Sequence, residues 1–574
     1  MMLNRRTLLT SIASTGIGTA LFHRSVAGAM VASNEVGVES IRQAEWITGV
    51  ELTDDERNEI LKTVSRTSAA MEKLRQVDLS YNTPMAIQFA PTASATQQSR
   101  LNRKSSTLRS VVIELPETEE AIAFLPVHQL SWLIRAQKIS SVDLTKIYLR
   151  RLKKYGGMLR SVVTLTEDLA LRQAAKADSE IAKGYYRGPL HGIPWGAKDL
   201  IAVEGYPTTW GLPQFREREL EGTATVAARL EEAGAVLVAK LSLGAIAMGD
   251  KWFGGMTRSP WNPRIGSSGS SAGSASSVVA GLVGFALGSE TLGSIISPSV
   301  RCGASALRPT FGRVSRDRCM PLCWSLDKIG PIARCMEDCA LIFNAIHGAD
   351  GKDNTAGSFP FQWPSKASLD NLKVGYAKSR TAPDADRADL KILKSMGCEL
   401  VEMSLPRSLP FSAMFSIIDV EASTLFDSMI RDGDTEGFNR WEQSFRAAQY
   451  VSAVDYVRVQ RARSLLMKQF DDAIAEVDFI INMNDLVQTN FTGHPSVVMP
   501  IDYRDRNSVR TPAPVILSGH LNDDERLLAF ADAFQAHVSA HQQHPELDTS
   551  LGLFNAQQLD LPKGEPKKAT PEAK

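Results

Sequence analysis

The chain has 574 residues, enough for one large enzyme, and its 43% hydrophobic and 22% charged residues are ordinary for a globular protein. Lysine and arginine together number 64, and so do aspartate and glutamate, so the formal net charge is zero. This balance gives no support to nucleic acid or an anionic membrane as a partner. Because no later segment has about eighteen uninterrupted apolar residues, we expect no membrane span after processing.

The first 29 residues are typical of a twin-arginine export signal. Arg5 and Arg6 precede a moderately apolar stretch, Leu8 to Phe22, and the small residues Ala27 to Ala29 fit a cleavage site. We therefore expect residues 1–29 to be removed and the mature protein to be periplasmic or extracellular.

Residues 30–116 are expected to form an accessory region without chemistry of its own. Helical periodicity extends over Val36 to Val50 and over Thr53 to Val77. Ala90 to Ser110 is rich in Ser, Thr, Gln and Arg, a composition typical of a surface loop.

Helix and strand patterns alternate from Ala121 onward, which predicts an α/β domain over residues 117–545 with a mixed central sheet wrapped by helices. The tail, residues 546–574, is expected to be disordered. The predicted helices are Val127 to Ala136, Asp143 to Tyr155, Glu167 to Lys183, Val226 to Gly234, Asp389 to Met396 and Ala453 to Ala475; the predicted strands are Ser161 to Thr166, Ala235 to Ala239, Lys373 to Tyr376 and Asp478 to Ile481.

A stretch of small residues, Gly266 to Thr310, is the most informative part of the chain. It begins with glycine and serine, continues with the apolar run Val278 to Leu287, and returns to small residues around Gly293. This pattern predicts a tight loop, a buried helix and a second tight loop. Glycine lets the backbone approach a ligand closely, and serine supplies hydroxyls for nucleophilic attack or proton transfer.

The same stretch contains a G-x-S-x-G sequence, Gly269 to Gly273, which would make Ser271 the nucleophile of an α/β-hydrolase. That elbow requires a strand immediately before it, whereas Arg258 to Arg264 contains two prolines. A phosphate-binding loop would require a lysine after the glycines, and none follows. A flexible linker would not continue directly into an apolar run.

A candidate base for serine chemistry is Lys198, which lies among small and apolar residues between His191 and Leu200. Desolvation lowers the pKa of an amine, so a buried lysine can be neutral and accept a proton near pH 7. The alternative is a lysine that pairs with the neighbouring Asp199 at the surface.

Four segments together resemble the amidase signature family in order and spacing: Gly192 to Asp199, Ser268 to Ser274, Gly288 to Ile295 and Leu307 to Val314. The resemblance implies a mixed sheet wrapped by helices. It also implies hydrolysis of the C–N bond of a small-molecule amide through an acyl-enzyme, with neither a cofactor nor a metal.

The resemblance further implies a Ser/cis-Ser/Lys triad, in which Ser294 is the nucleophile, Ser270 is the bridging serine after a cis peptide bond, and Lys198 is the terminal base. The backbone N–H groups of Thr291, Leu292, Gly293 and Ser294 would form the oxyanion hole, a donor set that typically contributes about 3–4 kcal/mol to acyl transfer. A relay through a second hydroxyl to a neutral lysine activates a serine without histidine. Ser271 would only line the loop.

Two positions depart from the family pattern: Leu292 stands where a glycine is usual, and Ile296 where an arginine is usual. Leu292 requires a backbone with negative φ, and Arg301 is expected to pair with Glu290 in place of the missing arginine. These departures motivate an alternative, a catalytically impaired amidase-like binding protein. The A subunit of a tRNA-dependent amidotransferase is a third interpretation, which the export signal disfavours.

The substrate pocket is expected between Phe359 and Asn490, the segment that departs most from the family pattern. The chain has six cysteines, four of them in two C-x-x-x-C pairs. Because Cys335 and Cys339 lie on an apolar helix pattern, we expect buried free thiols rather than a disulfide or a metal site.

Overall fold

The computed structural model describes residues 36–78, 87, 112–378, 384–506 and 509–548. The predicted export signal and the predicted loop at 90–110 lie outside the described residues, as does nearly all of the predicted tail. The chain separates into two compact units. One comprises residues 1–88 and 407–466, and the other residues 89–406 and 467–574.

The first unit is helical among its described residues. Helix α4 contacts both α14 and α16, and Ile41, Ile60 and Ala447 share one hydrophobic core. Helix α4 begins with a capping box, in which Thr53 and Glu56 each accept a hydrogen bond from the other's backbone N–H. The helices of this unit are α3 (Val38–Thr48), α4 (Asp54–Arg75), α14 (Phe411–Leu425), α15 (Asp427–Asp432) and α16 (Trp441–Ala448), and α17 (Ala453–Ile474) continues from it into the second unit.

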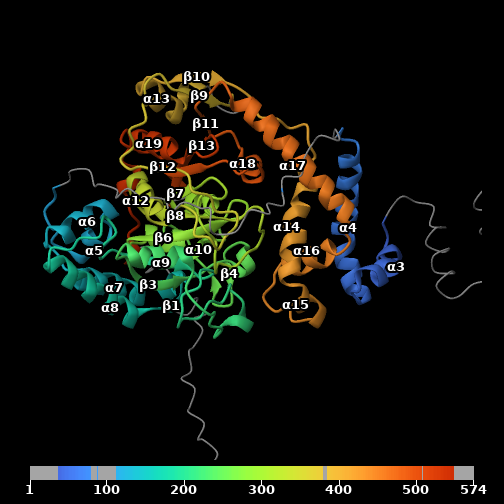
Figure 1. The fold of residues 1–574 in the computed structure, drawn as a ribbon, viewed down its shortest axis with the longest axis horizontal. Helices are drawn as coiled ribbons and strands as arrows, with labels where there is room; N and C mark the ends of the chain where they lie inside the picture. The colour runs from blue at the N-terminus through green and yellow to red at the C-terminus, as the bar shows by residue number, and fades with distance from the viewer. Residues whose placement is uncertain (1–35, 79–86, 88–111, 379–383, 507–508, 549–574) are drawn as a thin grey trace, which may run out of the picture. The chain divides into compact units, whose positions relative to one another are not determined.

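An eleven-stranded mixed sheet runs through the second unit in the order β1-β3-β2-β6-β8-β7-β12-β13-β11-β9-β10 (Figure 1). A separate hairpin pairs β4 with β5. The strands are β1 (Val162–Leu165), β2 (Pro194–Lys198), β3 (Val236–Leu241), β4 (Lys251–Trp252), β5 (Gly255–Met256), β6 (Phe285–Glu290), β7 (Ser305–Arg308), β8 (Lys328–Ala333), β9 (Lys373–Tyr376), β10 (Glu399–Glu402), β11 (Phe479–Ile481), β12 (Ser496–Arg506) and β13 (Val509–Gly519).

Two groups of helices pack on this sheet. Helices α7, α8, α10 and α11 bury apolar side chains in one common core with β3 and β6, and α9, α12 and α19 form a second group around α12. The α-helices are α5 (Glu119–Ala123), α6 (Val127–Arg135), α7 (Ser141–Leu159), α8 (Glu167–Ala182), α9 (Thr225–Glu232), α10 (Ala272–Val279), α11 (Ile296–Cys302), α12 (Met336–Ile346), α13 (Ala388–Ser395), α18 (Leu486–Thr492) and α19 (Asp524–Gln535); the short 3-10 helices are η1 (Pro213–Phe215), η2 (Ala245–Ala247), η3 (Asp384–Asp386) and η4 (Ala540–Gln542).

The α/β fold with a central mixed sheet is confirmed, and with one exception the predicted helices and strands appear within a few residues of their expected bounds. Ser140 caps α7, because its hydroxyl accepts a hydrogen bond from the backbone N–H of Asp143. All six cysteines are free, and Cys335 and Cys339 are buried thiols as predicted. Among the described residues, no helix has the length and apolar character needed to cross a membrane.

One predicted element is wrong. The run Val278 to Leu287 is not a buried helix, because α10 ends at Val279, a turn follows, and Phe285 begins strand β6. The turn contains Gly281 with a φ of +63°, a conformation that glycine adopts without strain and that ends a helix. A short apolar run fits a buried strand as well as a buried helix, so periodicity alone could not separate the two.

Candidate active site

Lys198 stands at the carboxyl end of strand β2, and the loop that holds Ser294 follows the carboxyl end of β6. The two strands are parallel neighbours, with Ala197 opposite Leu287. Carboxyl ends of parallel strands meet at one edge of a sheet, where open α/β proteins place their ligands. The fold therefore brings residues far apart in sequence to one edge.

The Lys198 amine is completely buried and is surrounded by serine hydroxyls. Its Nζ lies 2.7 Å from Ser270 Oγ, 3.1 Å from Ser271 Oγ and 2.9 Å from Ser289 Oγ. The backbone oxygen of Ser289 lies 3.3 Å away. Two of the three predicted catalytic side chains, Lys198 and Ser270, are thus in direct contact.

Burial lowers the pKa of Lys198 from 10.5 to about 7, against the opposing effect of the more distant Asp327 and Glu290 carboxylates. A substantial fraction of the amine is therefore unprotonated at neutral pH. The alternative surface pair with Asp199 is wrong, because Asp199 lies 2.8 Å from the amine of Lys240, and both partners are buried.

Ser271 contacts the lysine and orients it, whereas the sequence predicted only a place in the loop. Its hydroxyl donates to the backbone oxygen of Ser289 and accepts from the Ser289 N–H, both at 3.1 Å. Because the only hydrogen of the Ser271 hydroxyl is already donated to the Ser289 backbone oxygen, Ser271 Oγ accepts a hydrogen bond from Lys198. Acceptors at Ser271 and Ser289 can hold the two N–H bonds of a neutral amine, which leaves its lone pair for the Ser270 O–H.

Ser289 was missed at the sequence level. It precedes Glu290 in strand β6 and differs in no visible way from the many other serines of this region. The only available signal was its place inside the segment Gly288 to Ile295.

The loop before α10 brings Ser270 to the amine. The Gly269–Ser270 peptide bond is cis. A Cβ atom on Gly269 would lie 1.8 Å from the backbone oxygen of Gly249, so only glycine fits at this close approach of two backbones. No strand leads into this loop among the described residues from 259 to 270, so the hydrolase elbow that would make Ser271 the nucleophile is not formed.

Ser294 lies in the turn after β6 and is tied to the first loop, since its backbone oxygen accepts from the Ser271 N–H at 3.0 Å. Its exposed fraction is 8%, so it is nearly buried. In this turn Gly293 has a φ of +87°, whereas Leu292 is not among the residues with positive φ. The turn therefore accepts leucine at position 292 without backbone strain.

The backbone N–H groups of the predicted oxyanion hole, Thr291 to Ser294, are available. Among the residues that the structure describes, none accepts a hydrogen bond from any of these four groups. Next to them, the N–H groups of Ile295 and Ile296 donate to the carboxylate of Glu290, at 2.8 and 2.9 Å. This carboxylate closes the turn and caps α11.

The expected partner of Glu290 is wrong. Glu290 pairs with Arg308 at 3.0 Å and accepts from Asn490 at 2.8 Å, whereas Arg301 is exposed. Burial favours a raised pKa for Glu290, but Arg308 and the other donors outweigh it and lower the pKa. Arg308 lies in strand β7, so its proximity to Glu290 depends on strand order rather than on local sequence.

A cavity of about 200 Å³ adjoins the site at Ser289 and Thr291. Its wall includes Leu200 and side chains from residues 316 to 329. None of its lining residues comes from residues 359–490, the segment expected to form the substrate pocket.

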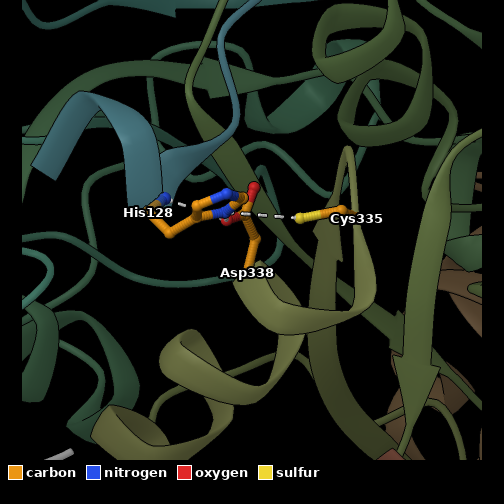
Figure 2. Close-up of side chains that lie close together, drawn as sticks. All are labelled: His128, Cys335 and Asp338. Atoms are coloured by element: carbon orange, nitrogen blue, oxygen red, sulfur yellow. Dashed lines mark hydrogen bonds and ion pairs between the residues drawn. The ribbon is translucent and has the colours of Figure 1, made fainter. Parts of the chain in front are cut away.

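A second cluster of titratable side chains, His128, Cys335 and Asp338, lies where α6 meets α12 (Figure 2). Asp338 accepts from the backbone N–H of Val127 at 2.8 Å and from the N–H and Nδ1 of His128, each at 3.0 Å. The Cys335 Sγ lies 3.7 Å from His128 Nδ1. Because Asp338 caps the N-terminus of α6, a structural role accounts for this cluster.

A family model described as Amidase matches residues 143–483, more than half of the chain. The chain belongs to the amidase signature family. As a member of this family it is a hydrolase that acts on carbon–nitrogen bonds. The match includes Lys198, Ser270 and Ser294.

Individual relatives agree with the amidase assignment. The A subunit of the glutamyl-tRNA(Gln) amidotransferase of Chloroflexus aggregans is 31% identical over 485 residues, which cover 74% of this chain and 98% of that protein. The peptide amidase of Stenotrophomonas maltophilia is 25% identical with a TM-score of 0.64, covering 74% of this chain and 98% of that one. A bacterial aryl acylamidase, 20% identical with a TM-score of 0.64 over 77% of this chain and 99% of that chain, shares the fold.

We predict that Lys198→Met stabilises the protein in a pH-dependent way. Because folding lowers the pKa of Lys198 from 10.5 to about 7, the unfolded chain binds more protons between these pH values, and wild-type stability rises with pH across this window. Methionine keeps most of the apolar stem without the charge. Urea unfolding should therefore show a gain in stability that is largest at about pH 7 and below and that shrinks toward about pH 10.

Lys240→Met is the matched control. It removes one partner of a buried ion pair and should destabilise the protein by about 3–5 kcal/mol. If Lys198→Met were as destabilising as Lys240→Met at about pH 6.5, the amine would not carry the desolvation penalty inferred from its burial.

Removing either orienting hydroxyl should slow turnover without abolishing it. Ser271→Ala and Ser289→Ala each delete one acceptor of the Lys198 amine, so we expect kcat/KM to fall by about tenfold, with KM nearly unchanged. Steady-state kinetics on any amide that the wild type hydrolyses checks this. A loss as large as that of Ser294→Ala would mean that the deleted hydroxyl itself attacks or relays the proton.

Proposed function

We propose that this protein is an exported amidase that hydrolyses a carboxylic amide through an acyl-enzyme on Ser294. The observation that carries the proposal is the buried Lys198 amine 2.7 Å from Ser270, with a pKa lowered to about 7. Lysine in this state accepts a proton, which a serine nucleophile without a histidine requires.

In the proposed reaction, Lys198 takes the proton of Ser270 as Ser270 takes that of Ser294. The Ser294 oxygen forms a bond to the amide carbon, and the negative charge that develops on the carbonyl oxygen is stabilised by N–H groups of the turn from Thr291 to Ser294. The C–N bond then breaks, and the leaving nitrogen receives the proton back through Ser270. Water, activated by the same relay, hydrolyses the acyl-enzyme and restores the Ser294 hydroxyl.

Leu292 and Ile296 had motivated the alternative of an impaired binding protein. Two findings favour the enzyme. The turn carries leucine at 292 with a negative φ, and Glu290 is held by Arg308 instead of an arginine at 296.

We predict that a fluorophosphonate probe labels Ser294. Peptide mapping by mass spectrometry should find the label on the peptide that contains Ser294 and none on residues 266–277. Ser270→Ala should slow labelling by about 10²-fold or more without moving the label, because a proton relay changes the rate and not the site of attack. Ser294→Ala is the negative control. A label on Ser270 or Ser271 would overturn the assignment.

Hydrolysis should rise with pH through a midpoint near 7, because Lys198 acts as a base only when unprotonated. A panel of amides, esters and amino-acid amides offered to the mature protein, with Ser294→Ala as control, separates the amidase from the binding protein. Absence of turnover of every compound, together with absence of labelling, would favour the binding protein.

Export is the part of the proposal that rests on sequence alone. Replacing Arg5 and Arg6 by lysine should leave the precursor in the cytoplasm, because the twin-arginine pair is what the export route reads. Cell fractionation and N-terminal sequencing check this, with a mature N-terminus expected near Met30. An intact Met1 on the normal cellular form would contradict export.

The amidotransferase subunit of Chloroflexus aggregans named above favours one further candidate, the A subunit of a tRNA-dependent amidotransferase. The equal numbers of acidic and basic residues give it no support from charge. Purification of the tagged full-length chain from its own cells distinguishes the amidotransferase subunit from the exported amidase. Co-purification of other subunits with tRNA would favour the amidotransferase, and a lone mature chain would favour the exported amidase.

A further inference from the structure

The cavity beside the candidate active site shares two residues with it, because Ser289 and Thr291 line the cavity. Ser289 contacts Lys198, and the N–H of Thr291 belongs to the turn that would hold the oxyanion. An amide whose carbonyl lies at this turn would therefore have the cavity next to it as space for one substituent. The nature of the walls therefore bears on which amides fit.

The walls are mainly apolar. Leu200, Met320, Leu322 and Ile329 line the cavity and are themselves nearly buried, with exposed fractions of at most 4%. Trp324 also lines it and is 42% exposed, so it stands where the cavity meets solvent. Such surfaces gain free energy by covering a hydrocarbon group and lose it by desolvating a charge.

The charged side chains on the lining already have protein partners, either an opposite charge or several hydrogen-bond donors. Arg316 pairs with Asp353 at 3.0 Å, and Asp317 pairs with Lys352 at 3.4 Å. Asp327 accepts from the N–H groups of Leu322 and Cys323 and from the Thr291 hydroxyl. A substrate carboxylate would therefore meet no unpaired cation on this lining, and a substrate ammonium group could meet only Asp327, whose oxygens already accept from three donors.

The volume of the cavity limits the size of the substituent that it can hold. A cavity of about 150 Å³ lined by leucine, isoleucine and phenylalanine holds one benzene molecule in another protein. The 200 Å³ here corresponds to a phenyl ring with a short linker, or to an alkyl chain of about six to eight carbons.

We propose that this cavity binds an uncharged apolar substituent of the scissile amide, of the size of a phenyl ring or a short alkyl chain. The inference rests on the proposed amidase activity and adds a substrate class to it. It excludes glutamine as the preferred substrate, because glutamine carries an ammonium and a carboxylate close to its amide side chain. Either side of the amide can carry the apolar group.

Two series of substrates test the proposal on the mature wild-type enzyme. Primary amides from acetamide to decanamide vary the acyl side, and N-alkyl acetamides of the same lengths vary the amine side. In one series kcat/KM should rise about three- to fourfold per methylene up to about six to eight carbons and then level off or fall. Phenylacetamide should exceed glutamine by at least about 100-fold.

Two variants assign the effect to the cavity. Trp324→Ala should lower the ratio of kcat/KM for phenylacetamide to that for acetamide, because it removes part of the apolar wall. Trp46→Ala is the matched control, since Trp46 is 75% exposed on α3 in the other unit and should leave the ratio unchanged. Leu322→Ala enlarges the cavity and should move the optimum to longer chains.

The outcomes separate this inference from the proposed function. If the enzyme hydrolyses acetamide but kcat/KM does not change with chain length in either series, the substrate class is overturned and the amidase activity stays in place. A preference for glutamine would have the same meaning. An unchanged optimum in Leu322→Ala, with folding verified by its unfolding curve, would also contradict it. Failure to hydrolyse any amide, with no probe on Ser294, would overturn both.

Discussion

The site depends on the buried amine of Lys198, which has no carboxylate at hydrogen-bond distance among the residues that the structure describes. Burial favours the neutral form of an amine, and a carboxylate in contact would restore the charge. The fold contains an example of each case. Lys198 contacts three serine hydroxyls, whereas Lys240 forms an ion pair with Asp199, the residue that follows Lys198. The end of strand β2 thus carries the proposed base at residue 198 and, at residue 199, one partner of a buried ion pair.

The rest of the site holds acceptors and donors in fixed directions around that amine. Ser271 accepts from Lys198 while its own hydrogen is engaged by Ser289, and the Ser271 N–H holds the backbone of Ser294. Glu290 in turn closes the loop that contains the available N–H groups. Because strands and helix ends supply these contacts, little rearrangement is needed before attack.

Much of this was predictable from sequence, and the failures have definite physical causes. The family segments pointed to Lys198, Ser270 and Ser294, of which the structure brings Lys198 and Ser270 into contact, and helical periodicity placed eight of the helices, α3, α4, α6, α7, α8, α9, α13 and α17. The strand β6 was missed because a short buried apolar run has no distinguishing period. The partner of Glu290 was missed because Arg308 lies near it only through the order of the strands in the sheet. Ser289 was missed because a single serine among many has no distinguishing sequence pattern.

The chain leaves the sheet-containing unit after Pro406 and re-enters it at Met467, and every residue proposed for catalysis precedes that excursion. Leu405 before it and Phe470 after it pack in the same hydrophobic cluster, so the excursion starts and finishes at one anchored point. The entropy of closing such a loop grows only slowly with its length. Related proteins can therefore gain, lose or exchange residues in the segment 407–466 while the Lys198 site stays unaltered. New binding properties can evolve in this segment separately from the chemistry.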